Sequence, residues 1–327
     1  MLSTERLKPS RSEYDITIHE SSVGIPTGAL KLFTSMNEGL VQFHEQFAFE
    51  YQEHITNSKQ AIIETANLAL TRAPKDKPTK VLVLGSGNCF DIPLEKLAEF
   101  DQVTLVELNG ESTEKAVQRL APDLQKKISI VVADIAGATK EFTTAIKSTA
   151  DTSSSMEQFL TEASPIPRTV SVTGGPDLGN DYTFVCSQLI MSQLASFLND
   201  FLQKTVTEKY KERSLHLLNS PDNKLLMNFT DLTATLMKEH INYLAKSVAP
   251  EGTIHLADTY ARILYPFHEP QIEPMIYTED IDPTIQKHFM PTPVVKKQWY
   301  WKNKPDPDRR DFYVVAQSFQ LKSVNEA

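Results

Sequence analysis

The feature that most constrains the fold is a strand-like run followed at once by a glycine-rich turn. Residues 81–84 read Val-Leu-Val-Leu, a short apolar run that is typical of a strand buried on both faces. Gly85 and Gly87 follow this run. Because glycine has no Cβ, the backbone can turn sharply here and a ligand can come close to the main chain. A helix is expected directly after the turn.

A second strand-like run follows about 20 residues later, as it does in a nucleotide-binding βαβ unit. Residues 102–109 contain alternating apolar positions and an acid, Glu107, near their end. In such a unit the turn lies under one end of a nucleoside and the acid bonds the ribose hydroxyls. The sequence therefore predicts a nucleoside site with Gly85, Ser86, Gly87 and Asn88 in the turn and Glu107 and Leu108 at the second strand.

The kind of nucleoside depends on one position of the turn. A dinucleotide site uses G-x-G-x-x-G, whose third glycine allows close packing of helix and strand. Here Phe90 stands at that position. The run from Val81 to Leu94, with Glu107 at the end of the next strand, resembles motif I of the class I S-adenosylmethionine-dependent methyltransferases. The resemblance implies S-adenosyl-L-methionine as cofactor, although Glu107 alone would also suit NAD.

Further strand-like runs extend the resemblance over residues 78–321. A third run, 127–135, contains Asp134, which the resemblance places near the adenine amino group with Ile135 beside it, and a fourth run, 181–187, adds Cys186 to the expected cofactor residues. A fifth run ends at Asp258. The last two runs, 298–301 and 311–321, are too close for a crossover helix and must pair antiparallel. The resemblance implies an α/β fold with a mostly parallel, seven-stranded Rossmann-like sheet and an antiparallel C-terminal hairpin.

The chain divides into two expected parts. Apolar residues recur every three to four positions in 37–55 and again in 58–70, which predicts an N-terminal helical extension or cap over residues 1–77. Residues 78–327 form the expected methyltransferase domain, with insertions near 151–180 and 205–223. The first insertion is rich in Ser, Thr, Gly and Pro, so we expect a mobile surface loop with a short helix near 156–160.

Composition narrows the classes of partner. The formal net charge is −9 and the pI is about 5.5, which disfavours nonspecific binding to nucleic acid or to an anionic membrane. Two cysteines, Cys89 and Cys186, suggest reduced thiols rather than a disulfide framework. The N-terminus lacks the apolar core of a signal peptide, and no run approaches the roughly 18 apolar residues of a membrane span. We expect a soluble, cytoplasmic protein.

Several residues allow two interpretations. Asp91 precedes Ile92-Pro93 and is placed to cap a helix, with ligand contact as the alternative. Cys186 is better explained as a small apolar residue of the sheet than as a nucleophile. An acceptor pocket, and any general base in it, would come from polar aromatic and acidic side chains on the N-terminal helix and after the fifth strand, although each alone is more often structural. These candidates are His44, Tyr51, His54, Asp258, Tyr260, Tyr265, His268 and Tyr277.

The acceptor is the part of the function that the sequence constrains least. Cys186-Ser187-Gln188 replaces the Asp/Asn-Pro-Pro-Phe/Tyr motif of methyltransferases that act on amino groups of DNA bases or glutamine. Residues 296–310 interleave aromatic and basic side chains, which favours a core-facing hairpin over a nucleic-acid patch. We expect methyl transfer to a small or medium-sized organic acceptor, with no metal. A protein or peptide acceptor, or a catalytically silent binding protein of this fold, remains the alternative.

Overall fold

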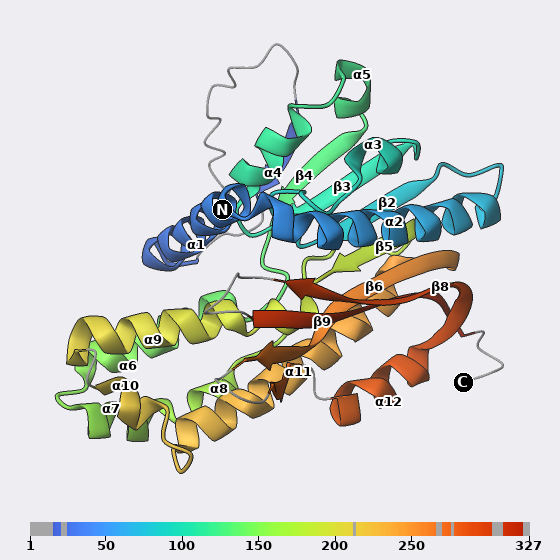
Figure 1. Ribbon diagram of the computed structural model, residues 1–327. Coiled ribbons are helices and arrows are strands. Elements are labelled where there is room, and N and C mark those ends of the chain that lie inside the picture. The colour runs from blue at the N-terminus through green and yellow to red at the C-terminus, as the bar shows by residue number, and fades with distance from the viewer. Residues whose placement is uncertain are drawn as a thin grey trace.

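The computed structural model describes residues 16–20, 25–211, 214–265, 270–275, 278–302 and 310–322. Its centre is a sheet in which nine strands of the described residues take part, in the order β1-β4-β3-β2-β5-β6-β9-β8, with β7 paired to β6 (Figure 1). The strands are β1 (Thr17–Glu20), β2 (Lys80–Leu84), β3 (Gln102–Glu107), β4 (Ile128–Val132), β5 (Tyr182–Gln188), β6 (Val248–Leu264), β7 (Gln271–Pro274), β8 (Phe289–Lys302) and β9 (Arg310–Leu321).

The pairing confirms the expected mostly parallel sheet with an antiparallel C-terminal hairpin. Strands β1 to β6 pair parallel with one another, β9 runs antiparallel to β6, and β8 runs antiparallel to β9. The expected count of seven strands was wrong, because β1 pairs with β4 and β7 pairs with β6. Both extra strands are four residues long and largely exposed, so they carry little apolar signal.

Helices cover both faces of the sheet (Figure 1). They are α1 (Thr27–Gln46), α2 (Ala48–Arg72), α3 (Leu94–Leu97), α4 (Gly110–Val117), α5 (Pro122–Gln125), α6 (Thr139–Thr152), α7 (Met156–Ala163), α8 (Ile166–Thr169), α9 (Ser196–Tyr210), α10 (Leu215–Leu218), α11 (Lys224–Ser247) and α12 (Thr278–His288), with a 3₁₀ turn at Met191–Gln193. Because side chains alternate along a strand, Leu82 and Leu84 pack with α6 to α11, whereas Val81 and Val83 pack with α2 to α4.

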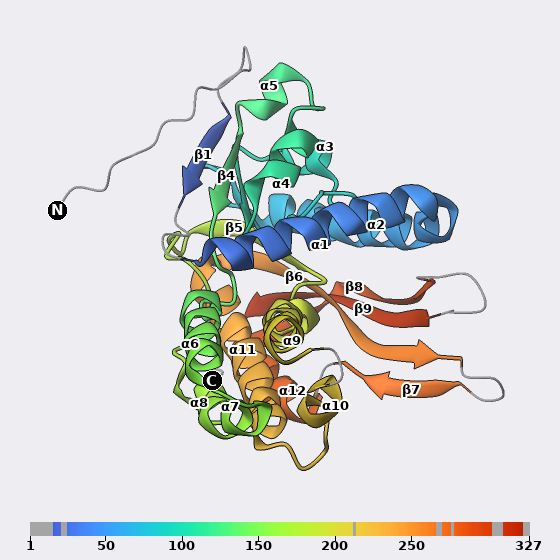
Figure 2. The ribbon, with the colours of Figure 1, turned by 90° about the vertical axis from the view of Figure 1, so that its left-hand side faces the viewer.

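The N-terminal helices lie almost end to end across the molecule (Figure 2). The helical spacing expected over 37–55 and 58–70 belongs to two helices that meet at Phe47, where φ is −118° and ψ is 34°. From α1, the side chains of Leu30, Phe33 and Met36 pack against the core cluster that contains Leu108 and Ile135. Helix α1 also lies beside the end of β3, because the side-chain amide of Asn109, which follows that strand closely, donates to the Thr34 hydroxyl at 3.0 Å.

Part of the first insertion is packed rather than mobile. Met156, Phe159 and Ala163 of α7 are buried, with Phe159 fully so. Their spacing of three and four residues gives the short helix one apolar face, and Ser155 caps it by accepting a hydrogen bond from the N–H of Gln158. The expectation of a surface loop was wrong here because the polar residues between these positions masked that face.

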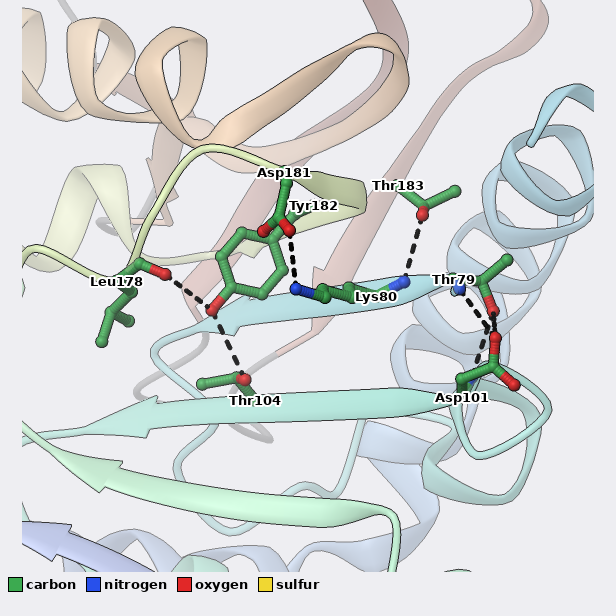
Figure 3. A network of polar contacts seen from close by, with 8 residues as sticks. All are labelled: Thr79, Lys80, Asp101, Thr104, Leu178, Asp181, Tyr182 and Thr183. Carbon is green, nitrogen blue, oxygen red and sulfur yellow. Dashed lines mark hydrogen bonds and ion pairs between the residues drawn. The ribbon is translucent and has the colours of Figure 1, made fainter. Parts of the chain in front are cut away.

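The amino ends of the central strands are held by paired polar groups (Figure 3). The Lys80 ammonium lies 2.6 Å from the Asp181 carboxylate, and the N–H of Lys80 donates to the Thr183 hydroxyl at 3.0 Å. The N–H of Thr79 donates to Asp101 at 2.7 Å.

None of the helices in the described ranges combines the length and the apolar character needed to cross a membrane.

Candidate active site

The sheet order reverses direction between β2 and β5, and a crevice at the carboxyl ends of such strands is where open α/β sheets bind ligands. β3 lies on one side of β2 and β5 on the other. The turn from Gly85 to Cys89 follows β2, Glu107 ends β3, and Gln188 ends β5. The fold therefore brings the turn and the acid to the same edge, as the sequence predicts for a βαβ unit.

Glu107 is aimed at the glycine turn. Its Oε2 accepts a hydrogen bond from the N–H of Gly87 at 2.6 Å, and its Oε1 accepts one from the N–H of Leu108 at 2.8 Å. Burial raises the pKa of Glu107, while hydrogen bonds from the N–H groups of Gly87, Leu108 and Asn109 act in the opposite direction. The carboxylate is therefore fixed against the turn, with one of its about four acceptor positions left for a ligand.

The two glycines of the turn have different surroundings. Both are left-handed, with φ of +70° at Gly85 and +50° at Gly87. A Cβ on Gly85 would lie 2.6 Å from Cδ1 of Ile190, so this space is filled by the segment after β5. A Cβ on Gly87 would meet only Glu107 Oε2, at 3.9 Å. A ligand can thus approach the main chain at Gly87, whereas at Gly85 the missing side chain serves packing.

Strained backbone marks both sides of the crevice. Cys89 has φ of 55° and Leu189 has φ of 55°, a conformation that non-glycine residues adopt at a cost and that concentrates at functional sites. Cys89 belongs to the turn after β2, and Leu189 follows β5 directly. The sequence analysis identified neither, because both positions carry ordinary apolar residues.

The remaining residues of the turn face α4 and α1. The hydroxyl of Ser86 is buried and lies 3.0 Å from that of Thr113, so it holds α4 in place. Asn88 lines a cleft of about 380 Å³ between α1 and α4. The other lining residues are Thr34, Asn37, Glu38, Val41, Gln42, Phe90, Asn109, Glu111, Ser112, Lys115, Ala116 and Arg119.

Asp134 lies at the expected edge but is largely occupied. Its carboxylate accepts from the N–H of Ala136 at 3.0 Å, the N–H of Thr139 at 2.7 Å and the hydroxyl of Thr139 at 2.9 Å. These contacts hold the start of α6. Since a carboxylate has about four acceptor positions, one remains for a ligand. Leu108 and Ile135 are buried in the core cluster against which α1 packs, and adenine contact by these residues stays a prediction.

Cys186 lies within β5, not at its end. It is fully buried and pairs in register with Val83 and His255. Burial, and to a lesser extent the charge of Asp91, raises the pKa of its thiol. This environment agrees with an apolar sheet residue, and its role in cofactor binding stays a prediction.

The expected helix-capping role of Asp91 was wrong. Pro93 occupies the N-cap position of α3, and no side chain caps that helix. The Asp91 carboxylate instead accepts from its own backbone N–H and from the side chain of Gln188. Burial raises the pKa of Asp91, and these hydrogen bonds together with the charge of Lys59 oppose that shift.

Gln188 belongs to a buried polar network that the sequence analysis missed. Its Nε2 donates to the Ser58 hydroxyl at 3.0 Å, and its Oε1 lies 3.1 Å from Nε2 of His255. The other ring nitrogen of His255 lies 3.2 Å from the Thr65 hydroxyl. Burial lowers the pKa of His255 to about 3, so the ring is neutral at pH 7. Three distant segments supply these residues, which is why no local motif revealed them.

Three of the proposed acceptor-pocket residues meet in one aromatic cluster. His44 stacks on Phe90 at a centroid distance of 4.0 Å and contacts Tyr51 edge-on at 5.4 Å. His54 stacks on Trp301 at 4.3 Å, and Tyr51 contacts the same indole at 5.3 Å. Within the described ranges, the buried Nε2 of His44 and Nε1 of Trp301 have no hydrogen-bond partner. The cluster thus offers two unused polar atoms, of which Nε2 of His44 belongs to the ring that stacks on Phe90.

The other proposed pocket residues are dispersed. Asp258 accepts from the N–H of Ser192 at 3.2 Å, and burial raises its pKa to about 6. The Tyr265 hydroxyl donates to Asp311 at 2.8 Å, and burial raises the pKa of Tyr260 to about 12. His268 and Tyr277 lie outside the described residues.

The C-terminal hairpin directs only part of its aromatic side chains into the core that the sequence analysis expected them all to face. Trp299 is 7% exposed and donates through Nε1 to His54 at 2.9 Å, whereas Tyr300 is 54% exposed. The hairpin aromatics therefore serve mainly the core. Lys304 and Arg309, which belonged to the alternative nucleic-acid patch, lie outside the described residues.

The strands β4-β3-β2-β5-β6 run parallel and are followed by the antiparallel strands β9 and β8, which are the directions that the resemblance implies. The fold is a Rossmann-like α/β fold, with a mostly parallel sheet closed by antiparallel C-terminal strands. No family model and no curated protein matches the sequence.

Solved structures with similar architecture include an S-adenosylmethionine-dependent methyltransferase from Clostridium acetobutylicum, with 10% identity, a TM-score of 0.38 and coverage of 83% of this chain and 98% of that chain. The glycopeptide N-methyltransferase MtfA, in complex with S-adenosyl-L-homocysteine, has 10% identity, a TM-score of 0.38 and coverage of 80% and 89%. The N-methyltransferase NodS from Bradyrhizobium japonicum has 10% identity, a TM-score of 0.35 and coverage of 82% and 87%. The assignment of the fold rests on the strand order.

Proposed function

We propose that the protein transfers a methyl group from S-adenosyl-L-methionine. The observation that carries this proposal is the Glu107 carboxylate bonded to Gly87 at a turn that does not lead directly into a helix. Residues 88–93 are not helical, and the four-residue α3 begins only after Pro93. A dinucleotide needs a helix N-terminus for its pyrophosphate, whereas a nucleoside sulfonium does not.

The residues at this edge fit the cofactor in part. Gly87 leaves its main chain open, and Glu107 has one acceptor position left for a ribose hydroxyl. Leu108 and Ile135 offer apolar surfaces for the adenine, with Asp134 beside them. When bound, the cofactor supplies a methyl group on a sulfonium, which is an electrophile. Helix α1 would keep water out of the site by covering these apolar surfaces.

The chain's own part in the transfer would be to hold the acceptor in line with the methyl group. The aromatic cluster of His44, Tyr51, His54, Phe90 and Trp301 supports a small or medium-sized organic acceptor. Burial lowers the pKa of His44, so its imidazole is neutral and its Nε2 can bond or deprotonate an acceptor. A protein or peptide acceptor and a silent binding protein are the alternatives, and the acidic net charge disfavours nucleic acid.

Isothermal titration of the full chain tests the cofactor. We expect micromolar binding of S-adenosyl-L-methionine or S-adenosyl-L-homocysteine and none of NADH. Binding of NADH alone would contradict the proposal. A cell extract supplied with methyl-labelled cofactor then tests turnover. Cofactor binding without label transfer to any component would favour the silent binding protein.

We expect the protein to act in the cytoplasm, where its two free thiols would stay reduced.

A further inference from the structure

We propose that a cavity between α11, α12 and the end of β9 binds a small molecule that carries phosphate groups. The cavity has a volume of about 660 Å³. Small-molecule sites typically have volumes of about 300–1,000 Å³, so this one has room for more than a single ion. The ligand is additional to the methyl donor and its acceptor, and the inference therefore does not rest on the proposed function.

The cavity is separate from the candidate active site. None of its lining residues belongs to the glycine turn, to the aromatic cluster or to the cleft between α1 and α4. Helices α11 and α12 lie on one face of the sheet, whereas α3 and α4 lie on the other (Figure 1). A ligand in this cavity would not compete with a ligand at the glycine turn.

The first step is the charge of the lining. Lys246 lies in the last turn of α11, Lys287 lies in the last turn of α12, and Lys322 follows β9 directly. In the part of the chain that the structure describes, none of these three ammonium groups has a carboxylate oxygen within 4.0 Å. Glu239 is the single acid of the described lining. The cavity thus carries excess positive charge in a protein whose formal net charge is −9.

The second step is how the wall of the cavity is held. Oε1 of Glu239 accepts from Nδ2 of Asn242 at 3.1 Å, and Oδ1 of Asn242 lies 2.9 Å from Nε2 of His288. Because an ionised carboxylate can only accept, the amide oxygen faces the histidine and Nε2 carries the hydrogen. Burial lowers the pKa of His288, and the positive charges of Lys287 and Lys246 lower it further. Both lysines therefore act on one ring of this wall.

The helix ends account for part of this charge. A lysine in the last turn of a helix is favourable, because the helix dipole places partial negative charge there. This reason applies to Lys246 and Lys287 but not to Lys322. The backbone N–H of Lys322 donates to the carbonyl of His288 at 2.9 Å and so brings a third segment to the end of α12. Three segments thus bring like charges to one cavity, and an anion would relieve their repulsion.

The third step is the chemistry of the ligand. Lysine has a compact charge with three donors and binds phosphate as a point charge. The described lining contains no arginine, whose planar fork would match a carboxylate in two places. The partial negative charges of two helix ends oppose a single negative charge, so the ligand needs at least two. Ala245 and Leu321 are half-buried parts of the lining and would contact an organic portion of the ligand.

Isothermal titration of the full chain with pyrophosphate, in about 0.01 M salt to limit screening, tests the proposal. We expect the wild type to bind pyrophosphate. The double variant Lys246→Gln/Lys287→Gln should bind it about tenfold more weakly, because two charge-assisted contacts are lost. The matched control is Lys147→Gln/Lys204→Gln, which removes two exposed lysines of α6 and α9 and gives the same net charge. The control should leave the affinity unchanged.

Titration with adenosine diphosphate separates two sources of the phosphate. Tighter binding than that of pyrophosphate identifies a phosphorylated organic ligand, and equal or weaker binding identifies inorganic phosphate. The inference is overturned if the wild type binds neither probe, or if the double variant and its control weaken binding equally. A double variant that is less stable in thermal denaturation but keeps its affinity also overturns it, because the lysines would then serve the helix ends alone. Binding of S-adenosyl-L-methionine, measured on the same samples, should be the same in all variants.

A variant that keeps the charges checks the interpretation. Lys246→Arg/Lys287→Arg retains both positive charges, so it should retain most of the affinity for pyrophosphate. A loss as large as that in the glutamine variant would mean that charge is not what binds the ligand, and would overturn the inference.

Discussion

The two edges of the parallel sheet are formed by the same strands but differ in how their polar groups are paired. At the amino ends, polar groups of adjacent strands are paired with one another: Lys80 with Asp181, and Thr79 with Asp101 (Figure 3). At the carboxyl ends, Asp91 and Glu107 have hydrogen-bond donors but no ion-pair partner in the described part of the chain. The left-handed residues Cys89 and Leu189 also lie there.

This difference indicates which edge is built for stability and which for a ligand. Polar groups whose hydrogen bonds and ion pairs are already formed within the protein have little free energy to gain from binding a ligand. Uncompensated carboxylates and strained backbone cost stability and persist where another role maintains them. The comparison predicts that substitutions at the carboxyl edge change both stability and binding, whereas substitutions at the amino edge change stability alone.

The largest expected effect is at Gly85. In Gly85→Ala, the new Cβ must adopt φ of +70° and would lie 2.6 Å from Ile190. Left-handed strain and overpacking together should lower the free energy of unfolding by about 2–4 kcal/mol, measured by urea denaturation. Adding Ile190→Ala should restore part of this loss, because it removes the contact.

Gly39→Ala is the control for this substitution. Gly39 lies within α1, and a Cβ there would have nothing within 4 Å. Alanine favours a helix over glycine by up to about 1 kcal/mol, so this variant should be slightly more stable than the wild type. Equal stability changes in the Gly85 and Gly39 variants would refute the packing role of Gly85.

The next largest effect is on binding at Glu107. Glu107→Ala removes the acceptor for the N–H of Gly87 and the expected contact with the ribose. Since a hydrogen bond to a charged group contributes about 1.5–3 kcal/mol, cofactor affinity should fall at least tenfold in isothermal titration. Asp101→Ala, at the amino edge, should reduce stability but leave affinity unchanged. Unchanged affinity in the Glu107 variant would mean that the site lies elsewhere.

The contrast between the edges also explains what the sequence could predict. The strands and the turn follow from local patterns: apolar runs, glycines and an acid at a fixed spacing. Gly87 and Glu107 meet because a βαβ unit dictates it. In contrast, the contact of Ile190 with Gly85 and the contact of Gln188 with Asp91 join segments about one hundred residues apart. No periodicity of the chain encodes such contacts.

The role of Asp91 and the strand β1 were not predicted correctly, and contacts between distant segments explain both cases. Asp91 has the sequence context of a helix cap, yet Pro93 occupies the cap position and the carboxylate turns toward Gln188. The strand β1 carries exposed side chains and is specified by its pairing with β4 rather than by its own pattern. In both cases a tertiary contact outweighs the local signal.

An effect of intermediate size concerns acid stability on the carboxyl side of the sheet. His240 is fully buried and its Nε2 lies 2.8 Å from the hydroxyl of Ser187, near the end of β5. Burial lowers its pKa to about 4. The unfolded chain takes up a proton at a pKa of about 6.5, so this residue favours unfolding as the pH falls from 6.5 toward 4.

Replacing His240 with Gln removes this titration. Between pH 7 and pH 5, the free energy of unfolding should therefore fall by about 2 kcal/mol less in His240→Gln than in the wild type, measured by urea denaturation at each pH. The amino edge behaves differently, because the hydrogen bond from the N–H of Thr79 lowers the pKa of Asp101. Asp101→Asn should leave the change between pH 7 and pH 5 as it is in the wild type. The same pH dependence in wild type and His240→Gln would exclude His240 as its source.

The smallest expected effect is at the ion pair between Lys80 and Asp181. Their nitrogen and oxygen lie 2.6 Å apart, but the Asp181 side chain is 62% exposed, so solvent and salt screen the attraction. A double-mutant cycle with Lys80→Met and Asp181→Asn should give a coupling energy of about 0.2–1 kcal/mol, falling in 1 M salt. None of the three variants should alter cofactor affinity. A change in affinity comparable to that of Glu107→Ala would show that the two ends of the sheet are coupled, and the division between a stabilising edge and a binding edge would have to be abandoned.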